Sequence, residues 1–438
     1  SIQSRRAESI CIGPNRDVCL SGLHNRHMHK TLALLLALLA GCSHPDTPPE
    51  SPVDFLAVPA GTQAAGPRLA GGAGQPLVLS WMEPDETGTT LWYSSYNDGT
   101  WSPPQAVVSD RNMFVNWADM PAVTPLGDNH WVAHWLEMAG SLTYSYHVVM
   151  AQSFDGGRNW SEPVKPHTDD TPTEHGFVSV FRLEGKAAAI WLDGRTTGGE
   201  HGSDPLHSGM TLRGAAIDAD NVLHDEQEID GLICDCCQTD VAVTTAGPVA
   251  VYRDRTVDEI RDIYVTRHAD SRWQPGAPLN DDNWQIAGCP VNGPAIAARG
   301  SDVAAAWFSV PSQAPAVQLR FSDDSAATFG PVFKLASDGA LGHVDVVMLV
   351  DGSAVVSWLQ AEAGGRGSLV LRRVEPDGTM GPATPIASGA PARSVPQMAI
   401  AGDDLVLVWT EAQQDTKRIA SARIPLDAVP LNLSLIHI

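Results

Sequence analysis

The sequence is poor in basic residues and in long apolar runs with helical spacing. Lys and Arg number 28 against 51 Asp and Glu, which gives a formal net charge of -23. So acidic a surface argues against nucleic acid and anionic membrane surfaces as partners, because both carry negative charge. The lack of long stretches with helical periodicity argues against a helical fold. Hydrophobic residues still make up 43% of the chain, which is enough for a globular core.

The apolar run of residues 31–39 is too short to span a bilayer as a stable helix. It follows Met28, His29 and Lys30 and ends at Leu39-Ala-Gly-Cys42, which resembles a bacterial lipobox. We therefore expect a lipoprotein signal over residues 28–42, acylation of Cys42, and an exported protein that meets the membrane only through this anchor. Residues 43–53 read as a Pro-rich tether. Residues 1–27 are expected to be translated upstream sequence, and residues 433–438 to be a sequencing-adaptor artefact.

Few cysteines are left once residues 1–42 are set aside. They are Cys234, Cys236, Cys237 and Cys289. An even number in an exported protein favours two disulfides. The alternative is a thiolate site for zinc or copper(I), with His175 as a further ligand. No other cofactor is expected. Residues 1–41 carry five basic and two acidic residues, so the mature chain is close to -26.

One aromatic residue recurs within a short apolar strand seven times, at intervals of 51 to 61 residues. The series is Trp81, Trp135, Trp191, Tyr252, Trp307, Trp358 and Trp409. A period near fifty, filled with short strands and turns, predicts an all-β propeller of four-stranded blades over residues 54–430. One blade alone cannot bury both faces of its sheet, whereas a ring of blades can.

The segment Ser153-Phe-Asp-Gly-Gly-Arg-Asn-Trp160 matches the turn pattern S-x-D-x-G-x-x-W. Its Ser and Asp side chains can bond turn backbone groups, and Gly permits a positive φ. Ser322–Phe329 is a weaker copy, and shorter ones begin at Asp98, Asp270 and Asp377. With these turns, the chain resembles the sialidase (BNR, Asp-box) superfamily. It departs from that family in having seven repeats where the family has six blades. Its single Arg-Ile-Pro triplet, residues 423–425, also lies at the wrong end.

The resemblance implies that the Asp-box turns mark one face and that the opposite face carries the central pocket. Loops expected on that opposite face hold the unusual residues of this chain. They are residues 116–119, 174–177, 193–195, 234–240, 253–262 and 289–294. Loops that were only solvated connectors would need few such residues, so we expect the site there.

Four arginines in these loops can form a guanidinium cluster that clamps a carboxylate or sulfate. The resemblance also implies a Tyr–Glu nucleophile pair, for which Tyr252 and Glu259 are candidates, and an Asp acid/base. The predicted catalytic residues are Arg195, Arg253, Arg261, Glu259, Asp119 and Asp193, and the predicted ligand-binding residues are Glu174, His175, Arg255 and Asn292. Tyr252 occupies a repeated aromatic position, so a core role competes with this one. Each Arg can equally pair with a neighbouring acid and brace a loop.

These features favour a sialidase-like exo-glycosidase, or a carbohydrate-binding propeller, that takes an anionic sugar at its central pocket. We expect a monomer with a small-molecule or glycan ligand. A metal- or redox-handling lipoprotein using the cysteines is one alternative, and a non-catalytic scaffold or binding propeller is another. The hydrolase hypothesis requires Arg195, Arg253 and Arg261 to converge on one pocket beside a carboxylate.

Overall fold

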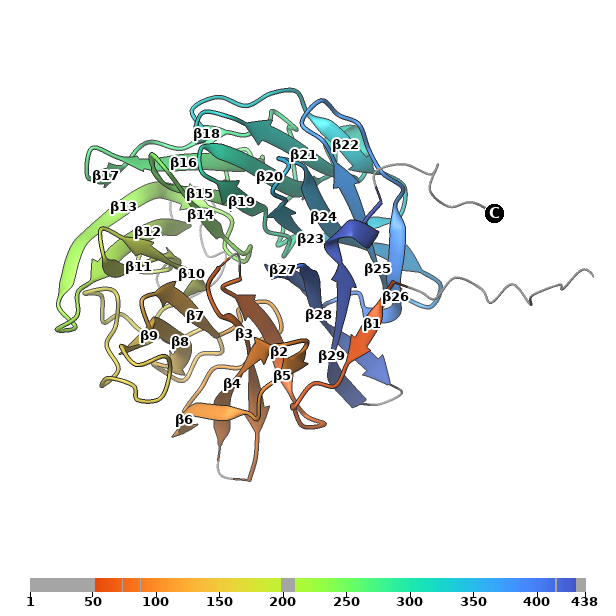
Figure 1. The fold of residues 1–438 in the computed structure, drawn as a ribbon. Coiled ribbons are helices and arrows are strands. Elements are labelled where there is room, and N and C mark those ends of the chain that lie inside the picture. Colours follow the sequence, from red (N-terminus) through yellow and green to blue (C-terminus); the bar gives the residue numbers. More distant parts are fainter. Residues whose placement is uncertain (1–51, 73, 87, 198–208, 414–415, 431–438) are drawn as a thin grey trace, which may run out of the picture. The chain divides into compact units, whose positions relative to one another are not determined.

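Seven small antiparallel sheets follow one another along the chain and are arranged around a central axis (Figure 1). The computed structural model describes residues 52–430 except 73, 87, 198–208 and 414–415. The predicted propeller is confirmed, with seven blades rather than six. The predicted signal, with Cys42, lies outside the described residues. Within them, no helix is both long enough and apolar enough to cross a membrane.

The first three blades come from the N-terminal half of the described chain. Blade 1 contains β2 (Ala65–Ala70), β3 (Leu77–Pro84), β4 (Thr89–Asn97), β5 (Thr100–Trp101) and β6 (Gln105–Arg111). Blade 2 contains β7 (Ala122–Gly127), β8 (His130–Met138) and β9 (Tyr146–Ser153). Blade 3 contains β10 (His175–Leu183), β11 (Lys186–Asp193), β12 (Met210–Ile217) and β13 (Leu223–Ile233).

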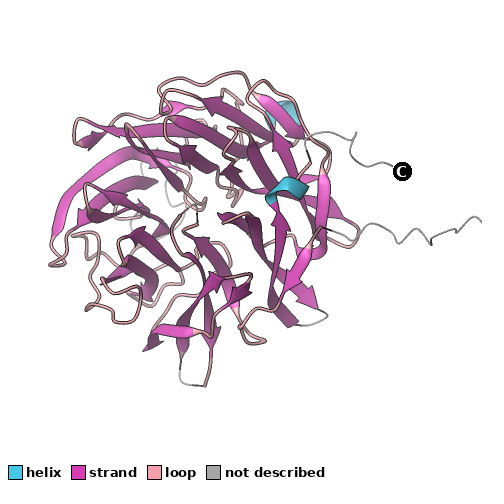
Figure 2. Ribbon diagram, in the orientation of Figure 1, coloured by secondary structure: helices cyan, strands magenta, loops and turns pink. Residues whose placement is uncertain are grey.

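The next three blades repeat this order. Blade 4 contains β14 (Asp240–Thr244), β15 (Gly247–Arg253), β16 (Ile263–Ala269), β17 (Arg272–Trp273) and β18 (Ala277–Pro278). Blade 5 contains β19 (Ala295–Arg299), β20 (Asp302–Ser309), β21 (Ala316–Ser322) and β22 (Phe333–Ala336). Blade 6 contains β23 (Ala340–Met348), β24 (Ala354–Glu362), β25 (Arg366–Val374) and β26 (Thr384–Pro391). Two 3-10 turns, η1 (Pro311–Gln313) and η2 (Leu426–Ala428), complete the described helical structure, and strands dominate Figure 2.

Blade 7 closes the ring with strands from both ends of the described chain. It contains β27 (Gln397–Ala401), β28 (Asp404–Gln413) and β29 (Thr416–Pro425), and its outermost strand is β1 (Asp54–Leu56). Asp54 pairs in register with Arg423, whose guanidinium also forms an ion pair of 2.9 Å with the Asp54 carboxylate. The first described strand therefore supplies the outermost strand of the last blade.

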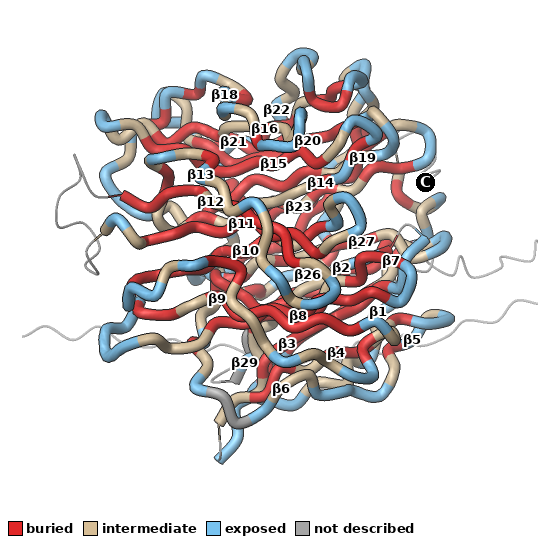
Figure 3. The backbone as a smooth tube through the Cα atoms, turned by 90° about the vertical axis from the view of Figure 1, so that its left-hand side faces the viewer, coloured by how far each residue is buried: buried red, intermediate tan, exposed pale blue. Residues whose placement is uncertain are grey.

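The seven repeated aromatics all lie on the second strand of their blade, and each is at most 1% exposed. They pack between neighbouring sheets, where the buried backbone of Figure 3 is concentrated. In four blades the indole Nε1 donates to a polar side chain two residues along. The pairs are Trp81–Glu83, Trp135–Glu137, Trp191–Asp193 and Trp358–Gln360. Tyr252 takes the same core position in blade 4, so its aromatic ring belongs to the repeat.

The turns after β9 and β21 share one hydrogen-bond pattern. The Ser153 hydroxyl accepts from Gly157 N at 2.9 Å, and Asp155 accepts from Asn159 N at 3.0 Å. Ser322 and Asp324 accept in the same way, from Ala326 N and Thr328 N. Both turns follow the third strand of a blade, so they lie at the end opposite the loops between blades.

Candidate functional site

The loops between blades and those after second strands enclose a pocket of about 540 Å³. We call it the loop pocket. Its walls include Trp117, Tyr144, Glu174, Phe177, Asp235, Cys236, Arg255, Glu259, Arg261 and Cys289. These residues come from five of the six predicted loop segments, and Tyr144 adds the loop between β8 and β9. Five of the six segments that the sequence assigned to this end of the propeller therefore meet around one cavity, and residues 193–195 do not line it.

Glu259 holds two arginines at the edge of the loop pocket. Its Oε1 accepts from Arg255 Nη2 at 2.6 Å, and its Oε2 accepts from Arg261 Nη2 at 2.8 Å. Arg255 also forms an ion pair of 3.1 Å with Asp235. Burial raises the pKa of Glu259, but the hydrogen bonds from the two guanidinium groups outweigh it and hold that pKa below its usual value. Glu259 therefore stays ionised and orients the arginines, which suits it poorly to donating a proton.

Glu174 forms the chemically most distinctive part of the pocket wall. The Tyr146 hydroxyl lies 2.6 Å from Glu174 Oε1 and 2.9 Å from Asp119 Oδ2. Phe177 N donates to the other oxygen of Asp119 at 2.7 Å. Burial, with the nearby charge of Glu174, raises the pKa of Asp119 to about 7. Two buried carboxyl groups thus share one tyrosine hydroxyl, and Asp119 gains or loses a proton near neutral pH.

Tyr146 and Glu174 form a hydrogen-bonded Tyr–Glu pair, whereas the sequence suggested Tyr252 with Glu259. Tyr252 is fully buried in the core, and its hydroxyl donates to Asp230 at 2.7 Å. Glu174 was predicted only as a ligand-binding residue, and Tyr146 was not singled out. Nothing in the sequence around Tyr146 indicated a functional role, because its hydrogen-bond partners Asp119 and Glu174 lie 27 and 28 residues away.

The predicted convergence of Arg195, Arg253 and Arg261 on one pocket is not observed, because only Arg261 lines the loop pocket. The guanidinium of Arg253 is 1% exposed and stacks 4.9 Å from the Trp284 ring. It donates to the backbone carbonyls of Arg261, Asn292 and Phe308 at 2.7, 2.8 and 2.8 Å. Arg253 therefore ties blades 4 and 5 together.

Three other predicted site residues also make internal contacts. Asp193 accepts from Arg195 Nη2 at 2.7 Å and from the Trp191 indole at 2.8 Å. Arg195 also forms an ion pair of 2.7 Å with Glu226. Arg195 therefore braces its loop, as the alternative prediction for the arginines stated. The Asn292 amide accepts from His343 N at 2.6 Å and donates to Leu341 O at 3.0 Å. These side chains hold backbone and loops in place.

The cysteines form one disulfide instead of the expected two. Cys236 and Cys289 are bonded in the wall of the loop pocket. Cys234 and Cys237 are free and buried, with their Sγ atoms 2.9 Å apart. Burial raises the pKa of the Cys234 thiol, but the hydrogen bond with Cys237 and the charge of Arg261 outweigh burial and bring that pKa down to about 7. Because two of the four sulfurs are already bonded, the predicted set of four thiolate ligands is not available.

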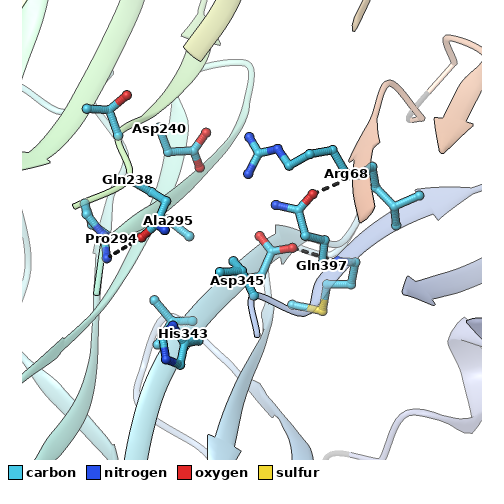
Figure 4. A pocket seen from close by; sticks show the side chains of 14 residues that line it. Arg68, Gln238, Asp240, Pro294, Ala295, His343, Asp345 and Gln397 are labelled. Atoms are coloured by element: carbon cyan, nitrogen blue, oxygen red, sulfur yellow. Dashed lines mark hydrogen bonds between the residues drawn. The ribbon is translucent and has the colours of Figure 1, made fainter. Parts of the chain in front are cut away.

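Charged side chains also line the central axis, where Arg68 extends toward Asp240 (Figure 4). Asp240 accepts from Ile296 N at 2.8 Å and Asp345 accepts from Met398 N at 2.7 Å, so each links its blade to the next. The sequence reasoning missed Arg68, although a charged residue in an innermost strand could have drawn attention to it.

The protein should become less stable as the pH rises toward 8, because the buried Asp345 then loses its proton. Burial, with the charge of Asp240, raises the pKa of Asp345 to about 7, above the value of about 4 in an unfolded chain. Its stabilisation is therefore complete below about pH 4 and is lost as the pH rises through 7. Thermal unfolding from pH 5 to 8 should show a smaller decline for Asp345→Asn than for the wild type. The exposed control Asp338→Asn should behave like the wild type. Identical slopes for Asp345→Asn and the wild type would refute this assignment.

No family model matches the chain, and no curated protein is similar to it in sequence. Among solved structures it is similar to the polysaccharide lyase Uly1, with 10% identity, a TM-score of 0.50 and coverage of 85% of this chain and 92% of that one. A protein of unknown function from Dyadobacter fermentans gives 12% identity, a TM-score of 0.48 and coverage of 85% and 99%. The K499G mutant of NanB sialidase from Streptococcus pneumoniae gives 8% identity, a TM-score of 0.44 and coverage of 86% of this chain and 95% of that one. At these identities the likeness shows the fold alone.

Proposed function

We propose, in place of the three-arginine hydrolase that the sequence predicted, that this propeller binds an anionic sugar in the loop pocket through Arg255 and Arg261 and cleaves its glycosidic bond with the help of Glu174. One observation carries the proposal. A single cavity of about 540 Å³ combines an indole, two guanidinium groups held in place by a carboxylate, and a carboxyl group hydrogen-bonded to a tyrosine. Apolar walls with a few convergent polar groups are typical of small-molecule sites.

The binding half of the proposal depends on Trp117, Phe177, Arg255 and Arg261. The aromatic rings offer flat apolar surface to a sugar ring. Each guanidinium has five N–H donors. The contacts of Arg261 to Glu259 and Cys234 use three of its donors, at Nε, Nη1 and Nη2. Donors therefore remain for a carboxylate or sulfate of the ligand, and Glu259 fixes the direction in which they point.

The catalytic half depends on the group formed by Asp119, Tyr146 and Glu174. Glycoside cleavage needs a carboxyl group that protonates the leaving oxygen. Glu174 is among the residues that line the pocket, and Tyr146 and Asp119 are not. With the pKa of Asp119 at about 7, a proton can be held within this group at neutral pH and passed through the Tyr146 hydroxyl to Glu174. If the pocket binds the sugar but does not cleave it, the protein is a carbohydrate-binding propeller.

Export and acylation at Cys42 are part of this proposal and are supported by the sequence pattern alone. An anchored, exported propeller would meet glycans outside the cytoplasm. The Cys236–Cys289 disulfide is compatible with that location, because disulfides persist in oxidising compartments.

Replacing Trp117 with alanine should weaken binding of an acidic oligosaccharide about tenfold, because one aromatic contact of about 1.4 kcal/mol corresponds to that factor. Ligands would first be found on an array of sialylated, uronate-containing and sulfated glycans, and then measured by calorimetry. Phe154→Ala is the matched control, since Phe154 is 51% exposed in the turn at the opposite end of blade 2. Equal affinities for the two variants would place the sugar elsewhere. Equal binding of neutral glycans would remove the anionic part of the proposal.

A further inference from the structure

Three histidines that the proposed function does not use cluster behind the loop pocket. His147 lies in β9, His167 in the connection from β9 to β10, and His175 begins β10. Their ring centroids are 4.3 to 5.2 Å apart, and one ligand nitrogen from each lies within 4.8 Å of the others. Three imidazoles from separate segments therefore converge on one point inside the protein.

Hydrogen bonds to backbone carbonyls fix the tautomer of two of these rings. His167 Nδ1 lies 3.0 Å from the carbonyl oxygen of Asp169, and His175 Nδ1 lies 3.1 Å from that of Thr173. A carbonyl oxygen only accepts, so each Nδ1 carries the hydrogen. The lone pair of each neutral ring is then on Nε2. An N–H held by a backbone carbonyl is also the usual orienting contact of a metal-bound histidine.

The lone pairs of the cluster lack donors among the described residues. His167 is 3% exposed, and its Nε2 is buried without a hydrogen-bond partner there, as is His147 Nδ1. His175 Nε2 faces Asp169 Oδ2 at 3.0 Å and Asp193 Oδ2 at 3.7 Å. Two acceptors cannot face each other at 3.0 Å unless a proton or a cation lies between them.

The charge around the cluster favours a cation. Asp169 places its carboxylate against His175, and Arg195 neutralises Asp193 on the outer side. Lys165 is another cation near the cluster, and it pairs with Asp170.

We propose that His147, His167 and His175, with the carboxylate of Asp169, bind a zinc ion. Three imidazole nitrogens and one carboxylate oxygen form a ligand set that zinc accepts in tetrahedral sites. The metal would tie β9 to β10 beside Tyr146 and Glu174, which are the neighbours in sequence of His147 and His175. It would therefore fix the positions of that pair without contacting substrate. This proposal does not depend on the proposed function.

Zinc content of the purified full chain tests the site directly. The chain would be stripped with a chelator, dialysed against zinc chloride and analysed by elemental mass spectrometry. We expect one zinc per chain for the wild type and at least about tenfold weaker binding for His147→Ala and Asp169→Asn. The double variant Cys234→Ser, Cys237→Ser is the matched control and should keep its zinc. No zinc in the wild type, or zinc lost from the cysteine variant and kept by His147→Ala, would overturn the proposal.

Cobalt(II) gives a second measurement that does not depend on the folding of any variant. Cobalt bound to the wild type by nitrogen and oxygen should show visible ligand-field bands without a sulfur-to-metal charge-transfer band. A charge-transfer band would place the metal at Cys234 and Cys237 instead. If circular dichroism shows that His147→Ala does not fold, the spectrum of the wild type decides between the two sites.

Discussion

Replacing Arg253 with methionine should lower the free energy of unfolding by about 3–5 kcal/mol. The guanidinium donates to three backbone carbonyls and stacks on Trp284, all in the buried interior. A hydrogen bond from a charged group contributes about 1.5–3 kcal/mol, and removing this one side chain ends several at once. Urea unfolding of the two proteins, followed by tryptophan fluorescence, would measure the difference.

The matched control for Arg253→Met is Arg418→Met. Arg418 has 54% of its side chain exposed and pairs with Glu411, so its loss should change stability by less than about 1 kcal/mol. The sequence predicted Arg253 as a catalytic residue. A variant that keeps its stability but loses sugar binding would restore that role and contradict the structural one.

Replacing Glu174 with glutamine should lower the rate of glycoside cleavage by about 10²- to 10⁴-fold, which is the range that general acid–base catalysis contributes. Glutamine keeps the shape and can still accept a hydrogen bond from Tyr146, but it cannot donate a proton to a leaving oxygen. The rate of hydrolysis would be measured from the sugar released from the oligosaccharide that the binding experiments identify.

Glu184→Gln is the control for Glu174→Gln, because Glu184 is exposed in the turn between β10 and β11 and lies outside the loop pocket. Binding should be nearly unchanged in both variants, so a loss of rate would reflect chemistry. Cleavage by Glu174→Gln at the rate of the wild type would rule out Glu174 as the proton donor. Binding without cleavage by the wild type would leave a carbohydrate-binding propeller.

The blade repeat was predictable because its cause is local. Each second strand needs one large apolar side chain to fill the space between neighbouring sheets, so an aromatic recurs about every fifty residues. Tyr252 shows the strength of this rule, since it fills the space that tryptophan fills in the other six blades. The resemblance to Asp-box propellers implied that Glu174, Cys236 and Glu259 lie at one end of the propeller, and all three line the loop pocket.

The contacts within that end were much less predictable. Arg253 and Arg255 are two residues apart in the sequence, yet one is enclosed between blades and the other lines the pocket. Cys236 and Cys237 are adjacent, and only the first is in a disulfide. Both pairs lie where a strand gives way to a loop, since β15 ends at Arg253 and β13 ends at Ile233. The alternation that assigns strand side chains to faces stops there, so the conformation of the loop decides between core and cavity.

The sequence by itself determined the class of fold and the number of repeats, and its resemblance to Asp-box propellers indicated the end on which the unusual residues gather. It did so because strand period, turn chemistry and the spacing of core aromatics are properties of short segments. Only the tertiary structure decided that Tyr146 meets Glu174, that β1 completes blade 7 and that His147, His167 and His175 converge. Those contacts join segments up to about 370 residues apart, and their distances depend on how seven twisted sheets close into a ring.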